Sequence, residues 1–238
     1  MSLIKVTSIV HPSGTANNIT LDNAGNVTIA RDLILTSTTL ASPTSAGLME
    51  YNGTSLYFTP LGTQRGIVPG MQFFRLGTPL VGTNATGAQN LLGVGVTVSS
   101  STVYAFDGVI LMSKSAGVTS HTLSTLFGGT ATIENITYWV YEGDNATSFT
   151  TNMSLAGTNI FGTTTASAVA VMGARTSAAL YVTLKLNGTV SITNGGTFIP
   201  QYSLSAAPGG AYTTAIGSYF NIYPIGTSGA NVSVGTWA

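Results

Sequence analysis

The chain contains no cysteine, so neither a disulfide framework nor a thiolate metal site is expected. Charge is nearly as scarce. Seven basic and seven acidic residues make up 6% of the 238 residues, whereas a typical soluble domain carries about 25%. The charges cancel and the basic residues form no cluster. This excludes the positive footprint that nucleic-acid binding requires.

Long apolar runs are also missing. No stretch of about 18 apolar residues occurs, so no membrane-spanning segment is predicted. The first residues lack the apolar core of a signal peptide, which predicts synthesis in the cytoplasm without export by that route. The apolar share of 44% is nevertheless too high for a disordered chain.

Neutral polarity replaces charge in this sequence. Threonine, serine, asparagine and glycine together occupy 106 of the 238 positions. Residues 186–238 and 145–174 contain no charged residue at all. Because surfaces of zero net charge and few charges tend to self-associate, we expect much of the surface to be buried between subunits.

The pattern predicts an all-β protein. Short runs of β-branched and aromatic residues are separated by glycine, asparagine and proline, and no long stretch has a helical period. Residues 1–70 are expected to form short β segments, with a hairpin near 48–59 around Asn52-Gly53. Residues 71–238 are expected to form an antiparallel, jelly-roll-like β-sandwich.

Within that sandwich the strands are expected at the following positions: 72–76, 91–98, 102–112, 121–127, 132–141, 166–174, 178–186, 189–193, 198–204, 216–223 and 231–237. Strict alternation from Ala178 to Leu186 predicts one buried and one wet face. Asn187-Gly188 is the typical sequence of a tight turn, which predicts a second hairpin there.

Two stretches resemble known virion proteins. Residues 19–29 (ITLDNAGNVTI), followed by Asp32 to Leu35, resemble the shaft-like β segments of bacteriophage tail fibres. Residues 45–59 (SAGLMEYNGTSLYFT) resemble a short element of phage virion proteins. The resemblance implies a virion structural protein, commonly a homotrimer with an N-terminal attachment segment and a distal, trimeric jelly-roll-type head. Because the shaft-like part is short, a capsid decoration protein fits as well as a tail fibre.

The candidate binding residues are of two kinds. Aromatic rings stack on the apolar faces of sugars, and Trp139 and Tyr141 should share one strand face with Tyr138 on the other. The candidate glycan or receptor contacts are Tyr138, Trp139, Tyr141, Glu142 and Asp144. The candidate contacts to the particle or to sister chains are Ile4, Val6, Ile9, Leu33 and Leu35.

No catalytic, cofactor or metal site is predicted. His11 and His121 lack the partners of a nucleophilic triad and are interpreted as incidental polar residues. The carboxylates after residue 71 are few: Asp107, Glu134, Glu142 and Asp144. Oxygen ligands at 142–145 suit calcium, but a solvated loop is the preferred interpretation.

The sequence therefore predicts a non-enzymatic virion surface component located on the extracellular particle. Its expected partners are copies of itself, other virion proteins and a host glycan or receptor, with neither nucleic acid nor a membrane span involved. The alternatives are a free carbohydrate-binding module or surface adhesin, and a tailspike-type polysaccharide depolymerase that uses two carboxylates.

Overall fold

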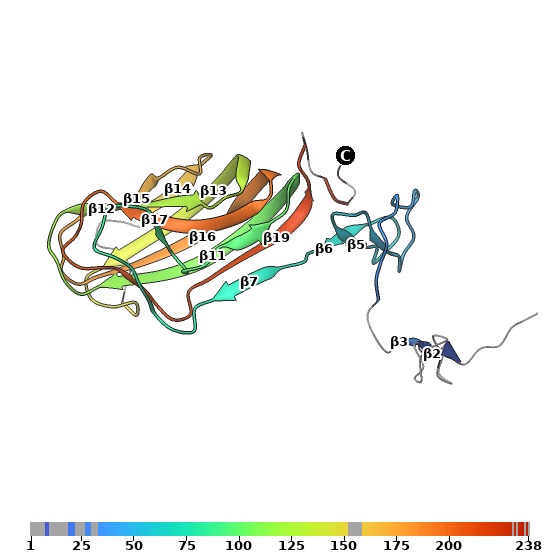
Figure 1. The fold of residues 1–238 in the computed structure, drawn as a ribbon, viewed down its shortest axis with the longest axis horizontal. Coiled ribbons are helices and arrows are strands. Elements are labelled where there is room, and N and C mark those ends of the chain that lie inside the picture. Colours follow the sequence, from blue (N-terminus) through green and yellow to red (C-terminus); the bar gives the residue numbers. More distant parts are fainter. Residues whose placement is uncertain are drawn as a thin grey trace, which may run out of the picture.

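The computed structural model describes residues 8–9, 19–21, 27–29, 33–151, 159–229, 231, 233–235 and 237. All regular elements in these ranges are β-strands, and all their pairings are antiparallel (Figure 1). The prediction of an all-β, antiparallel sandwich is confirmed. The described ranges contain no helix long and apolar enough to cross a membrane.

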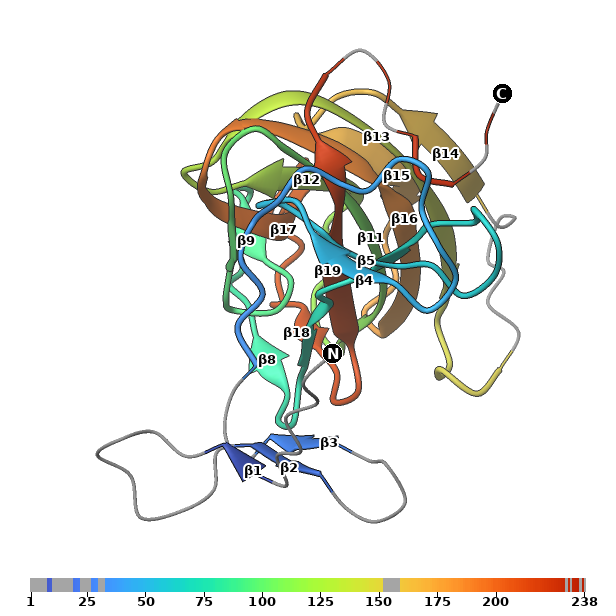
Figure 2. The ribbon, with the colours of Figure 1, turned by 90° about the vertical axis from the view of Figure 1, so that its right-hand side faces the viewer.

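Two small sheets precede the sandwich. The first is formed by β1 (Ser8–Ile9), β2 (Ile19–Leu21) and β3 (Val27–Ile29), in that order. The second is formed by β4 (Met49–Tyr51), β5 (Leu56–Phe58) and β6 (Gly66–Val68). Figure 2 views the molecule from the end at which β4 and β5 lie.

The hairpin between β4 and β5 forms where Asn52-Gly53 predicts it. Gly53 has a φ of +94°, a conformation that residues with a side chain rarely adopt. The Asn52 side-chain oxygen accepts hydrogen bonds from the backbone amides of Thr54 and Ser55, at 3.0 and 2.8 Å. The asparagine and the glycine thus fix the turn together.

The sandwich consists of two facing sheets. The larger sheet contains β7 (Gln72–Arg75), β8 (Leu80–Val81), β11 (Thr102–Lys114), β13 (Thr132–Asn145), β14 (Asn159–Thr163), β16 (Leu180–Asn194), β18 (Thr213–Thr214) and β19 (Tyr219–Thr227). The smaller sheet contains β9 (Gln89–Asn90), β10 (Val96–Val98), β12 (His121–Gly128), β15 (Val169–Arg175) and β17 (Gly196–Leu204).

The core lies between these sheets and follows the period of two. In β11 every second residue is buried, among them Phe106, Ile110 and Met112. At one level, rings from both sheets meet. Phe127 stacks on Phe198 with ring centroids 4.8 Å apart, and Phe106 lies 5.5 Å from Phe220. This aromatic layer joins β11 and β19 of the large sheet to β12 and β17 of the small one.

The predicted hairpin at Asn187-Gly188 is wrong. β16 runs straight through both residues and pairs with β11 on one side and β13 on the other. A Cβ at Gly188 would collide with Tyr138 and with the carbonyl oxygen of Thr137. The glycine is therefore required for close packing on the core face, not for a turn.

The two ends of the sandwich also differ from the prediction. The described residues within 231–237 lie outside any strand. The expected strand 91–98 contracts to β10, and β13 continues four residues beyond Tyr141. The second difference matters most, because it carries Glu142 and Asp144 into the sheet.

Candidate functional site

The predicted glycan residues of β13 lie on its two opposite faces. Tyr138, Glu142 and Asp144 point into the sandwich and are 2%, 0% and 0% exposed. Trp139 is half-buried and Tyr141 is exposed on the outer face. The predicted separation of Tyr138 from the other two rings is confirmed, but the five residues do not form one surface.

The predicted solvated loop at residues 142–145 is wrong, because these residues form the buried end of β13. The Asp144 carboxylate accepts hydrogen bonds from Arg175 Nε and Nη2, at 2.5 and 3.2 Å. This bond, helped by the nearby Glu142 charge, raises the pKa of Arg175. The guanidinium thus engages both oxygens of Asp144, and it ties β15 of the small sheet to β13 of the large one.

His121 begins β12 and is a buried residue, 1% exposed. Its Nδ1 lies 2.8 Å from the Thr119 carbonyl oxygen, and its Nε2 lies 2.8 Å from the Tyr212 hydroxyl. Because a carbonyl only accepts, Nδ1 carries the proton and neutral Nε2 accepts from Tyr212. Burial, and to a smaller degree the Lys114 charge, lowers the pKa of His121, partly offset by the bond to Thr119. His11 lies outside the described residues.

Lys114 is a buried cation that the sequence did not single out. Its side chain is held at the end of β11, and the residue is 3% exposed. The ammonium lies 2.5 to 3.2 Å from four backbone carbonyl oxygens, those of Ala116, Gly117, Ser177 and Ala178, so its three N–H groups are shared among them. Burial lowers the pKa of this lysine. It serves as a charged clamp between two loops, because carbonyl dipoles replace its hydration.

A groove of about 500 Å³ crosses the outer face of the large sheet. It is the candidate site that the geometry brings together, and we call it the outer groove. Its lining includes the following residues: Ala105, Asp107, Thr137, Trp139, Gly162, Asn187, Thr189 and Tyr223. This volume lies in the usual range of small-ligand sites.

Strand register places the central residues of the outer groove in one row. Trp139 on β13 lies opposite Asn187 on β16, and Asn187 lies opposite Asp107 on β11. Directly paired residues of an antiparallel sheet share a face. The Lys185 ammonium lies 5.9 Å from the Trp139 ring centroid and helps to hold the ring in place. Trp139 was predicted from the sequence, whereas Asp107 and Asn187 join it only through the register.

The four carboxylates do not form a hydrolytic pair on this face. Glu142 and Asp144 are interior, and Glu134 accepts a hydrogen bond from Ser191 at 2.7 Å. The strand register places Asp107 level with Trp139, and Glu134 precedes Trp139 by five residues on β13. The backbones of Glu134 and Asp107 are therefore about 16 Å apart along the strand direction. Glycosidases place their two carboxyl groups about 5 to 9.5 Å apart.

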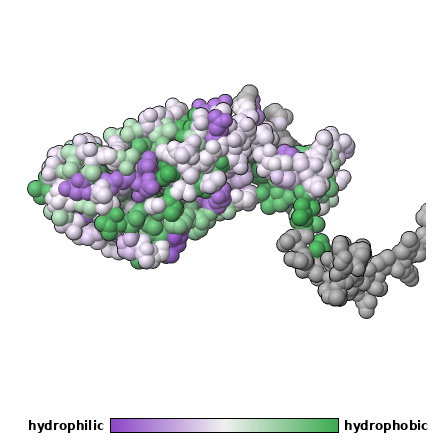
Figure 3. Space-filling model, viewed as in Figure 1, coloured by the Kyte–Doolittle hydropathy of each residue, from purple (hydrophilic) through white to green (hydrophobic). Residues whose placement is uncertain are grey.

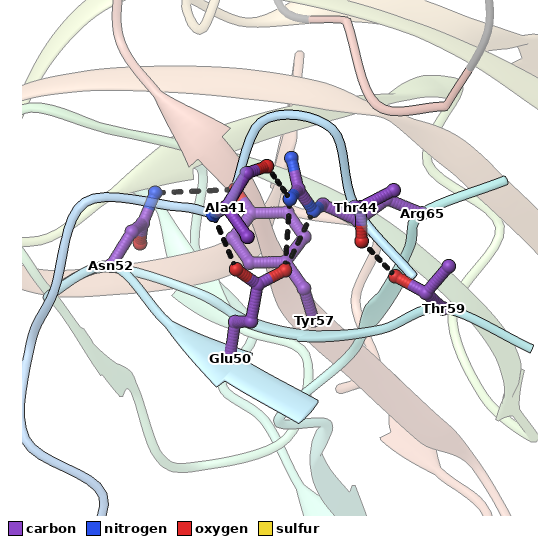
Figure 4. Close-up of polar contacts among 7 residues, drawn as sticks. All are labelled: Ala41, Thr44, Glu50, Asn52, Tyr57, Thr59 and Arg65. Atoms are coloured by element: carbon purple, nitrogen blue, oxygen red, sulfur yellow. Dashed lines mark hydrogen bonds and ion pairs between the residues drawn. The ribbon is translucent and has the colours of Figure 1, made fainter. Parts of the chain in front are cut away.

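The β4–β6 unit, residues 38–68, contains a polar cluster (Figure 4). Glu50 accepts hydrogen bonds from the Ala41 amide at 2.6 Å and from Arg65 Nε at 2.9 Å. Arg65 Nη2 also donates to the Ala41 carbonyl oxygen, at 2.6 Å. Glu50, Arg65 and Ala41 are therefore joined in a closed ring of hydrogen bonds. This ring fixes the segment around Ala41 to the sheet of β4–β6 through polar contacts and not through an apolar core.

Exposed apolar side chains gather where the β4–β6 unit passes into the sandwich. Met71 and Phe73, which follow β6 in the chain, are 54% and 57% exposed. Beside them, an apolar groove of about 230 Å³ is lined by Phe73, Phe74, Leu92, Val94, Pro200 and others. We call this the edge groove, because β7 is an edge strand. In Figure 3 strongly hydrophilic residues form only small, separate patches on the visible face, with apolar patches between them.

The predicted particle contacts are placed only in part. Leu33 is 63% exposed and Leu35 is half-buried. Ile9 lies in β1, and Ile4 and Val6 lie outside the described residues. Nothing in this arrangement tests their predicted role.

Comparison with known proteins gives a weak structural likeness. No protein-family model and no curated protein matches the chain. A chain of a solved structure, "Structure of infectious bursal disease virus Gx strain", is similar at 11% identity with a TM-score of 0.17. The match covers 67% of this chain and 43% of that chain. A TM-score of this size does not establish a common fold, and none of these findings tests the resemblance to phage tail fibres.

Proposed function

We propose that this chain is a non-enzymatic structural protein of a virus particle, of the kind found as a bacteriophage tail-fibre or capsid-decoration subunit. It works as a homotrimer. Residues 1–70 attach to the particle and to sister chains, and the β-sandwich forms the exposed head that meets the host surface.

The edge groove is the observation that carries this proposal. Large apolar side chains at Met71, Phe73 and Phe74 are 54%, 57% and 40% exposed in the single chain. Contiguous exposed apolar surface marks an interaction site in soluble proteins. A second copy of the chain is the occupant proposed, because the short edge strand β7 offers unpaired backbone groups beside the groove.

The distribution of charge supports assembly as well. Of the ten charged residues in the described ranges, six are buried or engaged inside the fold: Glu50, Arg65, Lys114, Glu142, Asp144 and Arg175. The four others are Arg75, Asp107, Glu134 and Lys185. A surface with so few charges has little electrostatic repulsion to oppose contact between copies.

Co-purification with particles tests the proposal. An antibody raised against the full chain would be used on density-gradient fractions of a lysate from a culture that carries the gene. We expect the antigen in the particle band, still bound after nuclease treatment. Antigen found only in the soluble fractions at the top of the gradient would contradict a virion role.

A free carbohydrate-binding module is the second candidate, and the outer groove favours it. The two functions differ in the state of the chain. The virion subunit requires an oligomer, whereas a free module works as a monomer of 24.3 kDa.

A further inference from the structure

We infer that the outer groove binds an uncharged oligosaccharide, with Trp139 as the stacking platform and Asp107 and Asn187 as the hydroxyl-binding groups. This inference extends the proposed role of the head in meeting the host surface. It stands on the groove alone, so it holds whether or not the chain forms a trimer.

The first argument is the composition of the groove. Two rings, Trp139 and Tyr223, flank a carboxylate and an amide, and the hydroxyls of Thr137 and Thr189 border them. A sugar ring has apolar C–H faces and a rim of hydroxyls that both donate and accept. Aromatic faces match the first, and Asp107 and Asn187 match the second.

The second argument is that these polar groups are unused. Within the described part of the chain, no side-chain hydrogen bond or ion pair involves Asp107, Trp139, Asn187 or Tyr223. By contrast, the other acids Glu50, Glu134 and Asp144 all have protein partners. The Asp107 carboxylate is half-buried and lies in one row with the Asn187 amide and the Trp139 indole. Water bound to this carboxylate can therefore be replaced by the hydroxyl groups of a ligand.

The third argument is charge. Asp107 is the charged residue of the lining, so the groove disfavours phosphates, nucleic acids and acidic sugars. Lys185, two residues before Asn187 on β16, has its ammonium 5.9 Å from the Trp139 ring centroid. An uncharged saccharide satisfies the carboxylate without placing like charges together.

The fourth argument is rigidity. Trp139, Asn187 and Asp107 lie on three neighbouring strands in the middle of the large sheet, not on loops. Sites on regular elements lose little conformational entropy when a ligand binds. A repeating saccharide lying across the strands would meet the row of three residues in order.

Intrinsic fluorescence of the full chain tests the inference. The chain has two tryptophans, so Trp237→Phe leaves Trp139 as the single reporter. The probes are maltohexaose, chitohexaose and mannohexaose as neutral oligosaccharides, with heparin and polygalacturonate as anionic ones. We expect at least one neutral probe to shift the Trp139 emission with a Kd below about 1 mM, and both anions to fail.

Three variants in the Trp237→Phe background locate the site. Asp107→Asn and Asn187→Ala should each weaken binding by about tenfold or more. Thr183→Ala, on the same face of β16 but outside the lining, should leave the affinity within about threefold. Circular dichroism and the mass in solution show whether each variant keeps its fold and its oligomeric state.

Three results would overturn the inference. One is the absence of binding by every neutral probe. Another is binding that Asp107→Asn and Asn187→Ala leave unchanged in folded protein. The last is loss of oligomer in these two variants, which would make the face a contact between copies. None of these results decides whether the chain belongs to a particle, because the gradient experiment addresses that separately.

Discussion

Replacing Arg175 by methionine should destabilise the sandwich strongly. The Asp144 carboxylate is 0% exposed, and Arg175, with a side chain 13% exposed, supplies both of its ion-pair hydrogen bonds. Methionine keeps much of the side-chain volume but removes the charge, so Asp144 would remain as a buried carboxylate without its counter-ion. Breaking a buried pair in this way costs about 3 to 5 kcal/mol.

The assay is thermal and urea unfolding of the full chain, followed by circular dichroism. For a β-domain of this size, about 3 to 5 kcal/mol corresponds to a fall in Tm of roughly 6 to 20 °C.

The double variant Asp144→Leu with Arg175→Met provides the control. Replacing both partners with apolar groups should recover most of the loss, since hydrophobic residues often substitute for a buried pair without cost. A single-variant loss below about 1 kcal/mol, or a double variant no more stable than Arg175→Met alone, would refute the reasoning.

The remaining predictions concern other buried groups. Burial lowers the pKa of His121 in the folded protein. Its contribution to stability should therefore be complete above about pH 6.5 and should be lost as the pH falls through the pKa of the folded state. The fall in Tm below about pH 6.5 should accordingly be smaller in His121→Asn than in the wild type. Lys114→Met removes the cationic donor shared by four carbonyl oxygens and should lower the free energy of unfolding by about 1 to 3 kcal/mol in urea titrations. Gly188→Ala forces a Cβ against Tyr138 and should cost about 1 to 3 kcal/mol in the same assay. Glu50→Gln weakens the ring of the β4–β6 unit, so hydrogen exchange at its backbone amides should quicken about tenfold while the Tm of the sandwich stays unchanged.

The fold was largely predictable because a period of two repeats along the strands. Leu180, Val182, Leu184 and Leu186 are all buried, as the alternation predicts. The local sequence predicts the wrong structure at a position where packing between strands determines the backbone path. Asn187-Gly188 has the composition of a turn, yet the glycine serves to admit the Tyr138 side chain beside it.

The candidate site was only partly predictable, because its members meet through pairing between distant strands. The faces of Trp139 and Tyr141 follow from their spacing alone. Asp107 joins Trp139 across two strand pairings, and Asp144 finds Arg175 31 residues along the chain. No local pattern contains either relation, so the sequence predicts Glu142 and Asp144 in a solvated loop that follows the strand of the rings.

The mass of the full chain in solution tests the central claim most directly. Light scattering coupled to size-exclusion chromatography measures it over a range of concentrations. The account predicts a single species near three times 24.3 kDa that persists on dilution. A stable monomer of 24.3 kDa would contradict the proposal that copies of this chain assemble through the exposed apolar surface of the edge groove.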